Sequence, residues 1–258
     1  MAGMTPLFRL SLWPDRLLLL GPGFDTDFHR HHAAQLCLGL EQDLRLRRDP
    51  AAEWMQARGF FVAPDQPHQF DAGSGAVALL YLEPESAACA AALRRFPGVG
   101  AALSADADAL AALRRLQQGE AEAADLSAAL HGFGIEAMPG APAVSDARVA
   151  AALRWIAAHI DAPVRLAAVA AAVHLSEGHL AHLFSAQVGV PLRRYVLWRR
   201  LRVALERALA GDSLTVAAHG AGFADSAHLS RTFRDNFGVA PSFLFEQRGR
   251  IAVRFYDD

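Results

Sequence analysis

The stretch AAHGAGFADSAHLSRTFRDNFGVAPS at residues 217–242 decides the fold of the C-terminal part of the chain. It has a near-copy upstream, VAAAVHLSEGHLAHLFSAQVGVP at residues 169–191. In each copy a small residue (Ala170 or Ala218) stands four positions before a turn residue, and an apolar residue follows the turn. Two helices that cross steeply over a short turn need a small residue where they touch. The repeat therefore predicts two helix-turn-helix motifs.

The turn residue of each copy is expected to have a positive φ. Glycine supplies that conformation at Gly222, and His174 stands at the same place in the first copy, where histidine tolerates it at a cost. The second helix of each copy carries a Leu and a Phe four residues apart, which predicts one buried face and leaves the opposite face free for a major groove. These pairs are Leu180 with Phe184 and Leu229 with Phe233.

The segment between the copies, residues 191–210, alternates apolar residues with arginines and predicts a helix of about 20 residues, roughly 30 Å long. Such a spacer suits two recognition helices that lie ~34 Å apart on one face of DNA. Its arginines Arg199, Arg200 and Arg202 are either phosphate contacts or solvated helix charges. Residues 1–143 have a net charge of −6 and residues 144–258 of +4, so positive potential lies where a polyanion would bind.

Residues 146–248 resemble the DNA-binding domain of the AraC/XylS family of bacterial transcription regulators. The resemblance rests on Gly222-Phe223, on Leu229 to Arg234 and on Phe237 to Ser242. It implies a sequence-specific transcription regulator that binds double-stranded DNA and contacts RNA polymerase if it is an activator. It also implies DNA-contacting positions on both second helices: Ser176, Gly178, His179 and His182, then Asp225, Ser226, His228, Arg231 and Arg234. Arg231 is the best candidate for a guanine contact, and His182 is its counterpart.

The N-terminal part consists of short apolar runs broken by turn signals, at residues 17–20, 35–40, 59–62 and 76–82. Such runs are typical of strands in a small β-sandwich or barrel, and Gly73-Ser74-Gly75 suits a hairpin turn. Helices are expected at residues 86–95, 105–118 and 120–131, before a Pro/Gly linker at 138–142. The predicted fold is α+β: a cupin-like β-barrel for effector sensing (1–85), a helical linker or dimerisation segment (86–143) and an all-α DNA-binding domain (144–258).

A histidine-rich motif lies in the predicted barrel. His29, His31 and Gln35, with His68 downstream, resemble the metal-binding pattern of cupins. Strand alternation places His29 and His31 on one face, and a barrel brings His68 from a neighbouring strand. Three interpretations stay open: a small organic effector bound by all four residues, a divalent metal on the three histidines, or a structural role. Sensor domains of AraC-type regulators resemble cupins and often keep such histidines without a metal, so we expect an effector site and no metal or cofactor.

Two classes of function compete. The first is a transcription regulator controlled by a small-molecule effector in the barrel, and the second is a cupin-type metalloenzyme with an appended helical module. The second gives no role to the duplicated helix-turn-helix. A catalytic cysteine is also disfavoured, because Cys37 and Cys89 have apolar neighbours that do not activate a thiolate. No catalytic residue is therefore predicted, and the protein is not expected to be an enzyme.

Assembly and location follow from the same features. In the resembled family the segment at 86–143 commonly mediates dimerisation, which implies a homodimer. The sequence has no run of eighteen apolar residues and no export signal at its start, so we expect a cytoplasmic protein without a membrane span.

Overall fold

The computed structural model describes residues 7–96, 100–103, 106–119, 144–246 and 248–256. The chain divides into two compact units: residues 1–141 together with 235–258, and residues 142–234. This grouping differs from the three-part division expected from the sequence, in which 144–258 is one domain. The third expected helix and the Pro/Gly linker lie outside the described residues.

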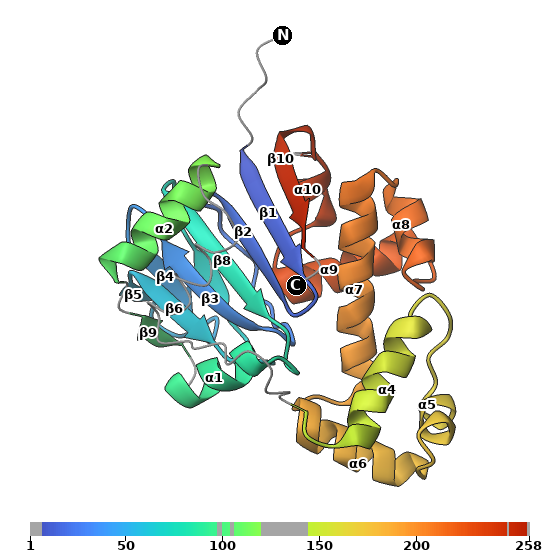
Figure 1. Ribbon diagram of the computed structural model, residues 1–258. Coiled ribbons are helices and arrows are strands. Elements are labelled where there is room, and N and C mark those ends of the chain that lie inside the picture. Colours follow the sequence, from blue (N-terminus) through green and yellow to red (C-terminus); the bar gives the residue numbers. More distant parts are fainter. Residues whose placement is uncertain (1–6, 97–99, 104–105, 120–143, 247, 257–258) are drawn as a thin grey trace. The chain divides into compact units, whose positions relative to one another are not determined.

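The first unit is built on two β-sheets (Figure 1). The larger has the order β10-β1-β2-β8-β3-β6-β9 and the smaller the order β5-β4-β7. Isolated bridges pair Asp25 with Asp71 and His29 with His68. The strands are β1 (Phe8–Trp13), β2 (Arg16–Pro22), β3 (Ala34–Gly39), β4 (Leu44–Arg47), β5 (Met55–Ala57), β6 (Gly59–Val62), β7 (Gln69–Asp71), β8 (Ala76–Leu82), β9 (Ala101–Leu103) and β10 (Ile251–Phe255). The four apolar runs singled out in the sequence are β2, β3, β6 and β8, which confirms the predicted sheet-rich region.

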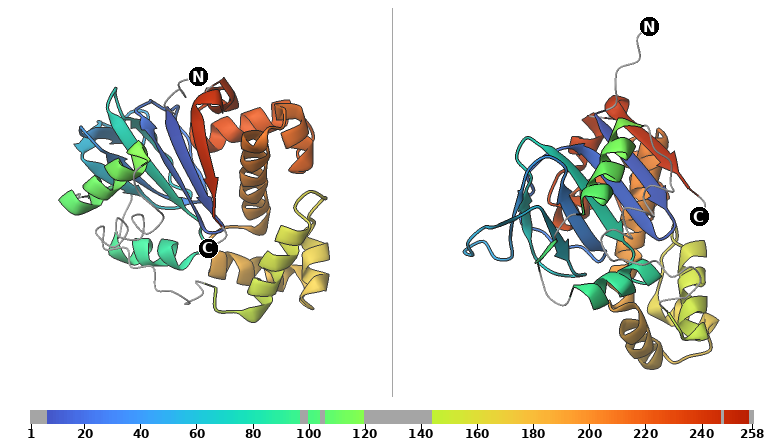
Figure 2. Two further views of the ribbon diagram at one scale, coloured as in Figure 1. Left: turned by 45° about the horizontal axis from the view of Figure 1, so that its top comes forward. Right: turned by 60° about the vertical axis from the view of Figure 1, so that its left-hand side comes forward.

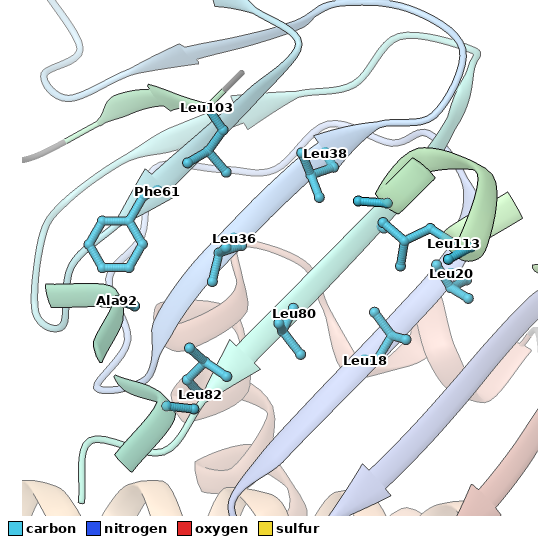
Figure 3. Close-up of a cluster of buried hydrophobic side chains, with 14 of the residues drawn as sticks. Leu18, Leu20, Leu36, Leu38, Phe61, Leu80, Leu82, Ala92, Leu103 and Leu113 are labelled. Carbon is cyan, nitrogen blue, oxygen red and sulfur yellow. The ribbon is translucent and has the colours of Figure 1, made fainter. Parts of the chain in front are cut away.

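Strand alternation gives the larger sheet two buried faces. One face carries Leu18, Leu36 and Leu80, and helices α1 (Ala87–Arg95) and α2 (Ala107–Gln118) cover it (Figure 3). Burying each leucine contributes about 2 kcal/mol. The other face carries Gln35 and Tyr81, which are paired across β3 and β8. The sheet therefore has an apolar side under the helices and a side on which polar groups are gathered.

The leucines of α2 pack on this sheet. Leu110 and Leu113 are 8% and 2% exposed and belong to the same cluster as the sheet leucines. Both helices confirm the predicted helices of this segment. The buried residues of both helices pack within the chain, whereas Leu93 of α1 is 42% exposed.

Two local expectations were wrong. Gly73 does lie in a turn with a φ of 59°, but this turn joins β7 and β8, which belong to different sheets, and it is not a hairpin. The C-terminal part is helical only as far as α10 (Pro241–Glu246). It continues through a 3-10 turn, η1 (Arg248–Arg250), into strand β10, which runs parallel to β1 beside it (Figures 1 and 2). Helical periodicity is absent from residues 251–255, and a five-residue segment with four apolar residues does not reveal a distant partner strand.

The second unit is all-helical. Its longest helix, α7, contacts α6 near one end and α8 near the other (Figure 1). The helices are α4 (Ala147–Ala158), α5 (Leu166–Ala172), α6 (Glu177–Val188), α7 (Leu192–Ala210), α8 (Leu214–Gly220) and α9 (Ser226–Phe237), of which α9 ends in residues assigned to the first unit. Among the described residues, no helix is both long and apolar enough to cross a membrane.

Candidate nucleic-acid interface and histidine cluster

The two copies of the repeat have the same turn geometry. Ala170 and Ala218 are buried at 2% and 0% exposure. Each accepts a hydrogen bond through its carbonyl from the apolar residue after the turn, at 2.9 Å from the Leu175 nitrogen and 2.9 Å from the Phe223 nitrogen. The turn residues His174 and Gly222 have φ values of 55° and 76°. α5 with α6 and α8 with α9 are therefore two helix-turn-helix motifs, as the sequence predicts.

Capping and anchoring fix the second helix of each motif. The Ser176 hydroxyl accepts from the His179 nitrogen at 3.3 Å, and an Asp225 carboxylate oxygen accepts from the His228 nitrogen at 2.6 Å. The bond from His228 holds the pKa of Asp225 below its usual value. The two predicted Leu/Phe pairs are all buried, at 0%, 0%, 2% and 5% exposure: Leu180, Phe184, Leu229 and Phe233.

The predicted DNA-contacting residues divide by exposure. In the first motif all four are exposed, namely the N-cap of α6 and three residues of the helix: Ser176, Gly178, His179 and His182. For α9 the exposed ones are Asp225, Arg231 and Arg234, and the half-buried ones are Ser226 and His228. The only cationic side chains fixed at neutral pH on these two faces, among those predicted, are thus the two arginines of α9. α6 has no lysine or arginine in its sequence.

His228 faces a groove between the two motifs. Its ring packs edge-on against Phe223 with centroids 5.2 Å apart. It also lines a cavity of about 550 Å³ together with Ala181 of α6 and Arg193 of α7. Its counterpart in the first motif, His179, is exposed instead. The two recognition helices therefore present different side chains at matching positions.

Two arginines of α7 act within the fold. Arg200 donates to the carbonyl oxygens of Ile160 and Ala162 at 3.2 and 2.8 Å, and its guanidinium lies where a Cβ on Gly222 would come within 2.9 Å. Arg202 is 7% exposed and pairs with Glu206 at 3.1 Å. Arg200 therefore ties the loop before the first motif to the turn of the second. For these two residues the structure favours an internal role over phosphate contact.

The first unit brings the predicted histidines together. His29 and His68 pair through two backbone hydrogen bonds of 2.9 Å each. Their rings and that of His31 have centroids 4.1 to 5.7 Å apart. Gln35 Oε1 lies 2.7 Å from His31 Nε2 and 3.2 Å from His68 Nε2, while its amide nitrogen donates to the Tyr81 hydroxyl at 3.2 Å.

Backbone carbonyls fix the orientation of all three imidazoles. Each ring donates its Nδ1 hydrogen to a carbonyl two residues away: His29 to Asp27 (2.9 Å), His31 to Ala33 (2.8 Å) and His68 to Gln66 (2.9 Å). A carbonyl oxygen only accepts, so Nδ1 carries the proton of each neutral ring and Nε2 carries a lone pair. One nitrogen from each histidine lies within 4.8 Å of the others, in a cluster that could hold a metal ion.

Burial keeps these rings neutral. His29, His31 and His68 are 5%, 1% and 0% exposed. Desolvation lowers the pKa of His29 to about 3 and holds the pKa values of His31 and His68 below their usual range. At neutral pH the cluster therefore consists of three uncharged imidazoles.

Comparison with known proteins identifies the repeat. Residues 169–247 match the family described as a helix-turn-helix domain. Over 107 residues the chain is 30% identical to the regulatory protein PocR of Salmonella typhimurium, covering 41% of this chain and 35% of that protein. It is 35% identical over 107 residues to the HTH-type transcriptional activator RhaS of Escherichia fergusonii (40% and 38%) and over 92 residues to the transcriptional activator NphR of a Rhodococcus species (35% and 27%).

Residues 169–247 form an AraC-type helix-turn-helix domain.

The fold of the whole chain resembles solved structures of ToxT from Vibrio cholerae. The structure of ToxT from strain O395 has a TM-score of 0.60, with 12% identity, and the match covers 90% of this chain and 98% of that one. A second structure, of ToxT bound to (E)-4-(8-methylnaphthalen-1-yl)but-3-enoic acid, has a TM-score of 0.61, 12% identity and coverage of 91% and 99%. This likeness concerns the fold. The chain spans only about a third of the length of the curated relatives it matches.

Sequence reasoning missed the residues that meet the histidine segment. Gly238, just after α9, accepts from the Asp27 nitrogen at 2.7 Å, and the Asp235 carbonyl accepts from the Arg30 nitrogen at 3.3 Å. The ring of Phe237 packs edge-on against Tyr81 with centroids 5.9 Å apart. All of these residues belong to the first unit. Residues 235–238 of the AraC-type domain thus contact the histidine-bearing part of the first unit.

The two cysteines lie in apolar surroundings, as expected from their neighbours in the sequence. Cys37 and Cys89 are each fully buried and free. Burial raises the pKa of Cys89 to about 12 and that of Cys37 still higher. Neither thiol is available as a thiolate nucleophile at neutral pH.

Proposed function

We propose that this protein is a sequence-specific DNA-binding transcription regulator, controlled by a small effector bound in the N-terminal β-unit. The observation that carries the proposal is the matched pair of motifs in the AraC-type domain, with the same turn bonds and with exposed recognition faces. The printed names of PocR, RhaS and NphR, all regulators or activators, support the same function.

The proposed contacts differ between the two helices. Arg231 has a guanidinium fork, which fits the O6 and N7 acceptors of guanine, and the exposed Arg234 is its proposed partner in DNA binding on the same helix. The first helix offers Gly178, His179 and His182, which supply shape and weaker hydrogen bonds. Residues 142–234 carry 11 arginines and 6 acidic residues, which supports attraction to a polyanion.

The wider assignment includes a cytoplasmic location, a homodimer, contact with RNA polymerase if the protein activates, and no catalytic activity. The metalloenzyme alternative has the histidines it needs, but a substrate would have to reach side chains that are 0–5% exposed. It also leaves both recognition helices without a role. Regulation is therefore the better-supported function.

The test is selection of bound duplexes by the full chain from fragmented genomic DNA, followed by binding titrations on the selected sequence. We expect one enriched sequence with two half-sites about one helical turn apart, ~34 Å. Affinity should fall steeply as salt rises, since phosphate contacts release counterions. Recovery of random sequence, or binding that does not change with salt, would overturn the proposal.

A further inference from the structure

The histidine cluster has the donor set of a metal site. One nitrogen from each of His29, His31 and His68 lies within 4.8 Å of the others, and Gln35 Oε1 lies beside His31 Nε2 and His68 Nε2; the four residues come from a loop, from strand β3 and from the position before β7. We infer that His29, His31, His68 and Gln35 bind one divalent first-row transition-metal ion, and that this ion is the effector of the proposed regulator. The regulatory half of this inference rests on the proposed function, and the metal site does not.

The outer contacts of the cluster are those of metal ligands. A metal-bound histidine almost always donates its second ring N–H to a carbonyl or carboxylate, which sets the tautomer and aims the other nitrogen. All three rings have this contact, at 2.8 to 2.9 Å. His32, which follows in the sequence, is turned elsewhere, with Nδ1 2.7 Å from an Asp65 carboxylate oxygen. The arrangement therefore selects three of the four neighbouring histidines.

Gln35 completes the donor set. Its Oε1 lies 2.7 Å from His31 Nε2 and 3.2 Å from His68 Nε2, and its amide nitrogen donates to the Tyr81 hydroxyl. An ion held by these two imidazoles would therefore have the Gln35 oxygen beside it as a further ligand.

The size and chemistry of the cluster define the ligand. The nitrogens of its three histidines lie within 4.8 Å of one another, and Gln35 is 2% exposed, so the space between these residues suits a single ion and not an organic molecule. Imidazole donors with one oxygen suit Zn²⁺, Co²⁺, Ni²⁺ or Fe²⁺, whereas Mg²⁺ and Ca²⁺ prefer all-oxygen sites. The expected effector is thus a transition metal.

A short path leads from the site to the end of α9. The His29 Nδ1 hydrogen bonds the Asp27 carbonyl at 2.9 Å, and the Asp27 nitrogen bonds the Gly238 carbonyl at 2.7 Å. A Cβ on Gly238 would lie 2.6 Å from His29 Nδ1, so backbone and ring are in direct contact. A metal on His29 would fix the ring and with it the loop that holds residues 235–238.

The experiment uses the untagged full chain, stripped of metal with a chelator and titrated with Co²⁺ and then Zn²⁺. We expect one equivalent of Co²⁺ with visible d–d bands, displaced by one equivalent of Zn²⁺. His68→Gln and His31→Gln should each weaken binding at least tenfold. Gln35→Glu should strengthen it, because a carboxylate is the better ligand for a cation. The control His159→Gln removes an exposed histidine of α4's C-terminus and should bind like the wild type.

Gln35→Glu keeps the metal site testable if a histidine variant fails to fold. Binding of less than one equivalent of metal per chain by the wild type would overturn the site. So would binding that is equal in the wild type, His68→Gln and Gln35→Glu.

The regulatory half is measured on the same samples. Affinity for the selected duplex should change at least fivefold between metal-free and Zn²⁺-loaded wild type, and should not respond to Zn²⁺ in His68→Gln. Equal affinity for the duplex with and without metal would overturn the proposal that the metal is the effector. The titration would still support the metal site. Failure of both forms to bind any duplex would overturn the proposed function instead.

Discussion

The two helix-turn-helix motifs share one backbone plan but differ in what surrounds it. Both have a buried alanine at the crossing, a turn residue of positive φ and a glycine of positive φ after the second helix. In the first motif the turn residue is His174 and the final glycine, Gly189, has open space around it. In the second motif Gly222 lies against Arg200, and Gly238 against the histidine-bearing loop. The repeated sequence gives both motifs the same backbone geometry, and the residues packed against that backbone differ between them.

This difference indicates that the two motifs have different roles. The first motif carries no arginine on its recognition helix and ends in solvent. The second motif carries Arg231 and Arg234 on its recognition helix, and the glycine after that helix contacts the histidine-bearing loop. We therefore expect sequence reading and effector response to depend mainly on the second motif.

The largest effect is expected from the two final glycines. Gly238→Ala and Gly189→Ala both place a Cβ at positive φ, which costs about 1–2 kcal/mol. Only at Gly238 does the Cβ also meet backbone and ring atoms, the Asp27 oxygen and His29 Nδ1, each at 2.6 Å. Overpacking of this kind adds about 1–3 kcal/mol. Urea unfolding of the full chain should show Gly238→Ala as clearly the less stable variant. Equal losses in the free energy of unfolding of the two variants would contradict the close contact of Gly238 with Asp27 and His29.

The next effect concerns DNA reading at matched positions. Arg231→Ala should lower affinity for the selected duplex by about 1–3 kcal/mol and relax preference at one base pair. His182→Ala, its counterpart, should cost less than about 1 kcal/mol, because an imidazole makes no bidentate guanine contact. Competition with single-base variants of the duplex measures both. Equal losses would mean that the two helices read DNA alike.

A smaller effect is expected at the turn of the first motif. His174 has a φ of 55° and an exposed side chain, so His174→Gly removes strain without removing a buried contact. We expect a gain in the free energy of unfolding of up to about 1 kcal/mol, since the added freedom of glycine offsets part of the relief. Gly222→Ala should instead destabilise, because its Cβ would lie 2.9 Å from the Ile160 carbonyl oxygen. A loss of stability in His174→Gly would show that the histidine has a role beyond the turn.

The sequence predicted what depends on local periodicity. The helix-turn-helix turns, their buried Leu/Phe pairs and strands β2, β3, β6 and β8 all follow from spacing within about twenty residues. The charged alternation of Leu44–Arg47 (β4) was too short to stand out. The parallel pairing of β10 with β1 joins Ile251 to Phe8, across nearly the whole chain. No local pattern encodes such a pairing, and for the same reason the contact of Gly238 with His29 was not predicted.

The histidine site was predicted in part. The alternation of His29 and His31 and the later His68 indicated a shared face, and the structure gathers all three with Gln35. The orientation of the rings was not predictable, because it depends on carbonyls of Asp27, Ala33 and Gln66 whose positions follow from the backbone path. That orientation is what favours an ion over the organic effector expected from sequence.

The smallest effect separates the two motifs by their N-caps. Asp225 has a pKa below its usual value because its carboxylate accepts from the His228 nitrogen, whereas Ser176 caps the first motif without a charge. A carboxyl whose pKa is lowered by folding stabilises the fold fully above its unfolded pKa and loses that contribution as pH falls through the folded pKa. Asp225→Asn keeps a capping oxygen but no titrating group. The variant should therefore be slightly less stable than wild type at neutral pH and should converge with it on the acid side, in melting temperatures recorded as the pH is lowered. Ser176→Asn, the matched change in the first motif, should shift the whole curve without altering its slope, and an equal change of slope in both variants would show that the acid response does not come from the cap of the second motif.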